Sequence, residues 1–372
     1  MPKWTEKGWP AGFATGTMRW DIFCRVIDNF GDIGVCWRLS AELAARGDTV
    51  RLWIDDPSAL EWMAPAGAVG VTVARWSGDT AWPEPGDAVI EGFGCELPMP
   101  FLRRMAGRHA EGRAPAWINL EYLSAEPYVA RSHRLLSPQL TGAGAGLRKQ
   151  FFYPGFSAET GGLLREADLA LRQSRFDARA WRAAHDLQPE GGERVVGLFC
   201  YQIAPLPALV DALATEPTLL VATHGVASRL AADTLGPTLR AGALRAVLLP
   251  ALPQIEFDHL LWSCDINVVR GEDSLVRALW ASRPFVWHIY PQSGDAHARK
   301  LHAFNALYLE DAGRDLTASY AALSDRWNGL ATGPITLPAI EPWRAHAARR
   351  CEQLLRQSDL VSQLRAMAAV TG

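Results

Sequence analysis

The sequence predicts an α/β protein made of two Rossmann-like, doubly wound domains that face each other across a cleft. Short apolar segments alternate with helix-length amphipathic segments, which is the order of βαβ units with parallel strands and right-handed crossovers. The alternation begins again after a polar, glycine-containing stretch at residues 187–193. The 372 residues also exceed the roughly 250–300 over which a single hydrophobic core keeps growing.

The first domain is expected over residues 20–187. A buried strand at 20–28 leads into a helix at 33–46, which Gly47 and Asp48 end. Further strands are expected at residues 49–54, 71–76, 88–92, 117–122, 134–137 and 149–156. Residues 1–19 lack the continuous apolar run of a secretory signal and are expected to form a disordered extension.

The second domain is expected over residues 188–340. Its strands are predicted at 194–201, 218–223, 246–249, 265–269 and 284–290, and its helices at 206–214, 255–264, 273–281 and 296–309. Residues 341–372 form an amphipathic helical segment that we expect to brace the domains.

Composition excludes several classes of protein. Hydrophobic residues make up 49% and charged residues 21%, as in ordinary globular proteins, and no stretch reaches the roughly 18 apolar residues of a membrane span. A net charge of −3 provides no general attraction to nucleic acid or to anionic membranes. The six cysteines form no CxxC pair, so we expect buried, reduced thiols in a cytoplasmic protein.

The first motif with chemical content is DNFGDIG, where the first strand meets the first helix. Glycines at such a turn let the backbone approach a ligand, and a helix amino end usually attracts anions. Here the turn carries Asp28 and Asp32 instead, so a cationic or proton-donating ligand fits better. Helix capping by either acid is the competing interpretation. The spacing of Gly31 and Gly34 is not the GxGxxG of dinucleotide sites.

The second motif follows the strand at 265–269 and opens a helix. Backbone N–H groups there, with Arg270 and the Ser274 hydroxyl, can hold a diphosphate, and Glu272 can accept hydrogen bonds from sugar hydroxyls. This order resembles the nucleotide-sugar half of fold-B glycosyltransferases. An ordinary capped helix with a solvated pair, Glu272 and Asp273, is the alternative.

Four residues at the carboxyl ends of neighbouring strands support a nucleotide-sugar site more weakly. Phe199 and Tyr201 can stack on a base, and Gln254 and Phe257 follow the strand at 246–249. Each could equally serve core packing or cap a helix.

The sequence contains no motif for an essential metal. Asp55 and Asp56 are adjacent and therefore do not form the DxD of metal-dependent glycosyltransferases, and there is no HExxH. We therefore expect metal-independent activity.

Several segments together resemble the protein-arginine rhamnosyltransferases of elongation factor P. These segments are DNFGDIGVCWRL, WINLEYLSAE, FFYPGF, TGGLLRE, AHARKLHAF and LPQIEFDHLLWSCDINVVRGEDSLVRALWASRPFVWHIYPQ. The resemblance extends from about residue 20 to the carboxyl terminus.

The resemblance implies a fold-B enzyme that moves rhamnose from dTDP-β-L-rhamnose to an arginine of elongation factor P with inversion. The nucleotide sugar is then a substrate, and no cofactor is implied. Asp32 and Asp28 become the acceptor-side acids in the first domain, with Asp32 as base and Asp28 as its orienting partner. The donor-binding positions become Phe199, Tyr201, Gln254, Phe257, Arg270, Glu272, Asp273 and Ser274.

Three other functions remain open at this point. A fold-B glycosyltransferase could act on a small-molecule or lipid-linked acceptor, and a nucleotide-sugar 2-epimerase shares the architecture. A nucleotide-binding regulatory protein without turnover is the third, although it would not need the two acids of DNFGD.

Overall fold

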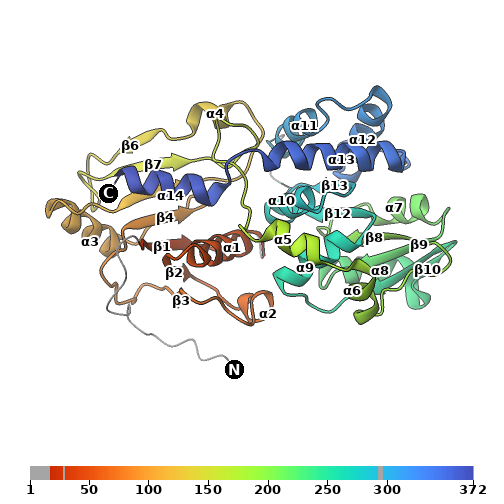
Figure 1. Ribbon diagram of the computed structural model, residues 1–372, viewed down its shortest axis with the longest axis horizontal. Helices are drawn as coiled ribbons and strands as arrows, with labels where there is room; N and C mark the ends of the chain where they lie inside the picture. The colour runs from red at the N-terminus through yellow and green to blue at the C-terminus, as the bar shows by residue number, and fades with distance from the viewer. Residues whose placement is uncertain (1–16, 28–29, 292–295, 372) are drawn as a thin grey trace. The chain divides into compact units, whose positions relative to one another are not determined.

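The computed structural model describes residues 17–27, 30–291 and 296–371 (Figure 1). The chain divides into two units. Unit 1 comprises Met1–Ala167 and Gln357–Gly372, and unit 2 comprises Asp168–Arg356. Most of the expected amino-terminal extension lies outside the described residues, but its last residue, Arg19, is the first residue of a strand.

Unit 1 contains a mostly parallel sheet that has seven strands among the described residues, in the order β3-β2-β1-β4-β5-β7-β6. Only β6 runs antiparallel to its neighbour. The strands are β1 (Arg19–Cys24), β2 (Thr49–Ile54), β3 (Val71–Arg75), β4 (Ala88–Gly92), β5 (Ala116–Leu120), β6 (Leu136–Pro138) and β7 (Arg148–Phe152). Each predicted strand of the first domain is therefore present. Strands β2 and β4 have the predicted bounds, and the ends of the others are shifted.

Strand β1 ends at Cys24 rather than at residue 28. Two carboxylates account for the early end. Asp55 accepts the backbone N–H of Val26 at 3.0 Å, and Asp32 accepts that of Ile27 at 2.9 Å. Because side chains take these backbone donors, the segment after Cys24 leaves the sheet.

Helices cover both faces of the unit 1 sheet. On one face, α1 (Gly31–Ala45) and α14 (Leu360–Thr371) contribute to the larger core cluster. On the other face, α3 (Met99–Ala110) packs on a second cluster through Phe101 and Met105. Two short helices, α2 (Leu60–Met63) and α4 (Tyr128–Ser132), complete the unit.

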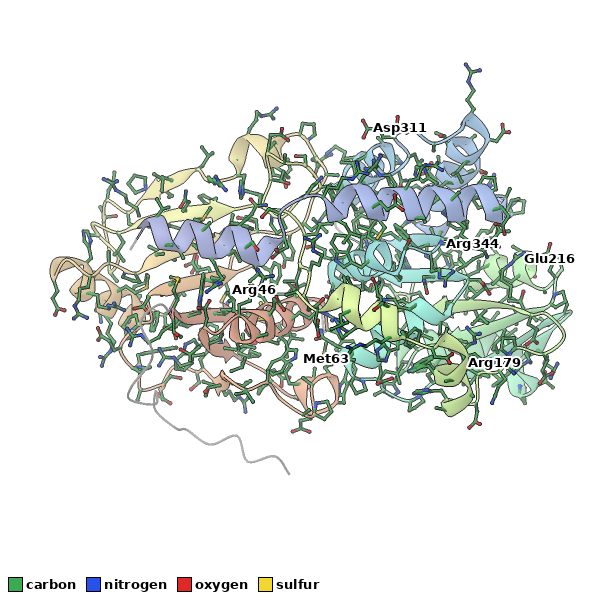
Figure 2. All side chains as sticks on the ribbon, viewed as in Figure 1. Arg46, Met63, Arg179, Glu216, Asp311 and Arg344 are labelled. Atoms are coloured by element: carbon green, nitrogen blue, oxygen red, sulfur yellow. The ribbon has the colours of Figure 1, made fainter. Side chains whose placement is uncertain are left out.

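The carboxyl-terminal helical segment consists of two helices. Helix α13 (Ile340–Leu355) belongs to unit 2, whereas α14 buries Leu360, Val361 and Leu364 in the core of unit 1. Asp359 accepts the N–H of Ser362 at 2.9 Å and so starts α14. It also pairs at 2.9 Å with Arg46, the residue after α1. Arg46 is labelled in Figure 2.

Unit 2 contains a sheet that has six strands in its described part, in the order β10-β11-β9-β8-β12-β13. The strands are β8 (Arg194–Leu198), β9 (Thr218–Ala222), β10 (Arg240–Ala241), β11 (Leu244–Leu248), β12 (Ile266–Arg270) and β13 (Phe285–His288). The sequence analysis did not identify β10, which has two residues and pairs antiparallel with β11.

The predicted helices of unit 2 are present as α7 (Leu206–Leu213), α9 (Gln254–Ser263), α10 (Gly271–Ala281) and α11 (Ala296–Tyr308). Helices α8 (Val226–Leu235) and α12 (Arg314–Trp327) were not predicted. The helices α5 (Leu169–Arg175) and α6 (Ala178–Ala184) also lie in unit 2. The units therefore divide after Ala167 and not at residue 187, because Trp181 of α6 donates to Glu256 of α9 at 2.6 Å.

A buried ion pair joins α9 to α10. Arg277 donates to the two carboxylate oxygens of Asp258 at 2.9 and 2.7 Å. The two side chains are 1% and 0% exposed. Arg172 of α5 lies 3.6 Å from the same carboxylate. The pair therefore fixes the spacing of two helices from inside unit 2.

Removing one member of this pair should strongly destabilise the protein, because the other charge is left buried without its partner. We expect Asp258→Ala to lower the free energy of unfolding by about 3–5 kcal/mol, measured by urea denaturation. Glu341→Ala is the matched control, because it breaks an exposed pair with Arg344, which is labelled in Figure 2. It should change the free energy of unfolding by less than about 1 kcal/mol. Equal effects of the two substitutions would show that the buried pair does not hold α9 and α10 together.

Candidate active site

Each sheet has a point where its strand order reverses. In unit 1 the chain runs from β1 to β2 and β3 on one side and then crosses to β4 on the other. In unit 2 the strands β9 and β12 flank β8 in the same way. Ligands of doubly wound sheets bind outside the carboxyl ends of the strands at such reversals. The sequence-predicted residues lie at these ends: Asp32 after β1, Phe199 and Tyr201 after β8, and the 270–274 turn after β12.

Asp32 lies in the first turn of α1 and is 3% exposed. Its Oδ2 accepts the backbone N–H of Ile27, which precedes the helix, at 2.9 Å. The N-cap position belongs to Phe30, whose ring packs edge-on against Trp62 with 5.1 Å between centroids. The Ile27 bond ties Asp32 to the loop after β1. The other predicted acid, Asp28, lies outside the described residues.

Asp55 is a second carboxylate near this strand end. It directly follows β2, and its Oδ1 accepts the N–H groups of Val26 and Asp56, each at 3.0 Å. Asp32 and Asp55 therefore both anchor the short loop that follows β1. The sequence analysis considered Asp55 only as part of a metal motif. Its position directly after an apolar strand next to β1 was the available signal.

The charges of these two acids affect a neighbouring thiol. The pKa of Cys24 is raised well above its usual value by a hydrogen bond with Cys36, by burial, and by the negative charges of Asp32 and Asp55. The thiol therefore stays protonated and unreactive. All six cysteines are free and buried, as the sequence analysis predicted.

In unit 2, Arg270 is held between aromatic rings. Its guanidinium carbon lies 4.5 Å from the ring centroid of Phe199 and 4.5 Å from that of Tyr201, and the residue is 7% exposed. Phe257 of α9 meets Phe199 edge-on at 5.5 Å. Gln254, the first residue of α9, is also buried. The structure thus brings Phe199, Tyr201, Phe257 and Arg270 into one cluster.

The turn from β12 into α10 is fixed from two sides. Gly271 has a φ of +66°, a conformation that side chains other than glycine rarely adopt. The indole N–H of Trp287 on β13 donates to the Gly271 carbonyl at 2.8 Å. The Ser274 hydroxyl accepts the N–H of Arg270 at 3.1 Å and donates to the Arg270 carbonyl. In this structure Ser274 therefore shapes the backbone of the turn.

The first turn of α10 carries two acids, Glu272 and Asp273. A helix amino end stabilises negative charge at such positions. Glu272 also pairs with Lys300 of α11, whose Nζ lies 2.5 Å from Oε1. The sequence analysis did not identify Lys300, because no sequence pattern links it to an acid 28 residues earlier.

His288, at the end of β13, is a neutral member of this region. Its Nδ1 accepts the N–H of Tyr201 at 3.3 Å. Burial, and then the charge of Arg270, lower the pKa of His288 to about 3. The imidazole is therefore uncharged at neutral pH. His288 adds no second positive charge beside Arg270 from the adjacent strand.

The described residues lack two kinds of structural feature. Within them, no three or more His, Cys, Asp or Glu side chains are grouped so as to hold a metal ion. No helix in the same residues has the length and apolar character needed to cross a membrane.

Comparison with known proteins places the chain in a family. The family model for the elongation factor P (EF-P) rhamnosyltransferase EarP matches residues 20–369. The protein-arginine rhamnosyltransferase of Pseudomonas aeruginosa is 42% identical, with 93% of this chain and 97% of that protein covered. That of Neisseria meningitidis serogroup B is 39% identical, with 83% of each covered.

Solved structures agree with the sequence comparison. A structure described as the basis for EarP-mediated arginine glycosylation of translation elongation factor EF-P is 30% identical, with a TM-score of 0.64 over 96% of this chain and 100% of that one. A glycosyltransferase from Rickettsia africae, which is 8% identical, shares the fold with a TM-score of 0.50. The match covers 95% of this chain and 98% of that one. The two α/β units thus have the fold of fold-B glycosyltransferases, and the chain belongs to the family of elongation factor P rhamnosyltransferases.

Proposed function

We propose that this protein transfers rhamnose from dTDP-β-L-rhamnose to an arginine side chain of elongation factor P, with inversion and without a metal ion. The observation that carries the proposal is that this member of the family has a buried acid in unit 1 and a buried cation in unit 2. Asp32 lies in the helix that follows β1 of one sheet, and Arg270 is the last residue of β12 of the other, each at a strand-order reversal. The acid suits a cationic acceptor, and the cation suits an anionic donor.

The acceptor chemistry requires carboxylates. A guanidinium stays protonated at all accessible pH values, with a pKa above about 12, so it is a poor nucleophile. A carboxylate pair can bind it through two parallel hydrogen bonds and aim one nitrogen at the anomeric carbon. Asp32 then accepts the proton as the C–N bond forms, while Asp28 orients the group. The Ile27 N–H holds the Asp32 carboxylate in one orientation for this step.

The donor chemistry requires positive potential and an aromatic platform. The N–H groups at the start of α10, together with Arg270, would bind the diphosphate and offset the charge that develops on departing dTDP. The rings that enclose Arg270 also offer faces for the thymine base. Glu272, Asp273 and Gln254 would accept or donate hydrogen bonds to hydroxyl and base atoms. Displacement by the arginine nitrogen in one step inverts the anomeric centre.

Asp32→Asn tests the base assignment. The amide retains an oxygen for the Ile27 N–H but cannot accept a proton, so turnover should fall by roughly 10²–10⁴-fold in single-turnover assays. The affinity for dTDP, measured by calorimetry, should stay the same. If Asp32 only stabilised the helix, the loss would be about 1 kcal/mol of stability with near-normal kinetics.

Asp55→Asn is the control for that experiment, since Asp55 directly follows β2 and binds the same loop as Asp32. It should reduce turnover far less than Asp32→Asn. A folded Asp32→Asn enzyme with wild-type turnover would end the assignment.

Arg270 and Ser274 test the donor site. Arg270→Met removes the charge that would bind the diphosphate, and we expect dTDP affinity to fall by about 10–100-fold, the scale of hydrogen bonds to charged groups. Ser274→Ala should weaken binding less, because it loosens the turn without removing charge. Arg179→Met, an exposed arginine of the same unit (Figure 2), should leave dTDP affinity unchanged. Unchanged affinity in both site variants would remove this site from the proposal.

Metal independence has a direct test. If Arg270 and the α10 amino end supply all the positive charge at the diphosphate, activity on elongation factor P should survive dialysis against EDTA. Intact-mass measurement of the acceptor reports the transfer. Loss of activity that Mg²⁺ or Mn²⁺ restores would contradict this part of the proposal.

A further inference from the structure

Glu272 and Lys300 form an ion pair between two helices of unit 2. Nζ of Lys300 lies 2.5 Å from Oε1 of Glu272, and the side chains are 17% and 18% exposed. Exposed ion pairs contribute little to the stability of a folded protein, because water screens the charges and two long side chains must be ordered. Here both groups are largely removed from water, so each charge depends more strongly on the other.

Other contacts already hold the two helices in place. The amino end of α10 is bound to β13 through Trp287, and α10 is bound to α9 through Arg277 and Asp258. Helix α11 is anchored in the core by the buried Leu301 and Phe304. The fold therefore does not depend on Lys300, and the direct effect of its charge falls on the Glu272 carboxylate.

We propose that Lys300 is a positioning residue for the nucleotide sugar. It holds the Glu272 carboxylate in one orientation at the start of α10, where that carboxylate accepts a hydrogen bond from a hydroxyl of the donor's sugar. A carboxylate has two oxygens and about four lone-pair sites, so one group can bond to an ammonium and to a hydroxyl together. Holding the acceptor group in place before binding reduces the entropy lost when the sugar docks. This inference rests on the proposed function, because it requires a nucleotide-sugar donor.

Lys300→Met keeps the length of the side chain and removes its charge. We expect the KM for dTDP-rhamnose to rise about tenfold, near the lower end of the scale for one hydrogen bond to a charged group, while kcat changes by less. The affinity for dTDP, which lacks the rhamnose, should change less than the affinity for the full donor. Lys300→Arg retains the charge and should recover part of the loss.

A double-mutant cycle with Glu272→Gln tests whether Lys300 acts through Glu272. If it does, Lys300→Met should have almost no further effect on donor binding in the Glu272→Gln background. If Lys300 instead bound the diphosphate directly, Lys300→Met would weaken the binding of dTDP and of the full donor equally in both backgrounds. That result would overturn the positioning role. Lower melting temperature with unchanged KM would also overturn it.

Arg299→Met is the matched control, since Arg299 precedes Lys300 on the same helix and is exposed. It should leave the KM unchanged. A wild-type protein that neither binds nor consumes dTDP-rhamnose would contradict the proposed function. A wild-type protein that does both, with Lys300→Met kinetically normal, would contradict only the role of Lys300.

Discussion

The buried pair of Arg277 and Asp258 is the interaction on which the candidate donor site depends. Asp258 directly follows Phe257, and Arg277 lies one helical turn after Ser274, so the pair links two helices close to their site residues. Two charges removed from water hold each other strongly only in good geometry, because the cost of desolvation is large. The geometry of this pair therefore constrains where the first turns of α9 and α10 can lie.

The two candidate sites share a construction but differ in charge. Each lies where a strand order reverses and a helix begins, which is the position at which doubly wound folds bind ligands. In unit 1 this position carries the buried acid Asp32, and in unit 2 it carries the buried cation Arg270. The low pKa of His288, about 3, keeps that histidine neutral and leaves Arg270 as the cation beside the aromatic rings. Under the proposed function, the same fold would serve ligands of opposite charge in its two units.

Much of this could be predicted from the sequence, because local patterns determine it. Apolar runs bounded by turns located every strand except β10, whose two residues carry no periodic signal. The motifs DNFGDIG and RGEDS placed Asp32 and Arg270 at strand-to-helix turns, where the structure has them. The residues of the aromatic cluster around Arg270 were each predicted individually. Their contact with one another was not predicted, because the order of the strands in the sheet was not known.

What only the tertiary structure decided depends on contacts between residues far apart in the chain. The units divide after Ala167, and α14 returns to unit 1, because packing assigned α5 and α6 to one core and α14 to the other. The Ser274 hydroxyl binds its own turn, and Lys300 reaches Glu272 from another helix. The sequence by itself determined the elements and the chemistry of their ends, since both follow from local spacing. Partners of charged groups were decided in three dimensions, because a charge pairs with whichever group the fold brings within a few ångströms.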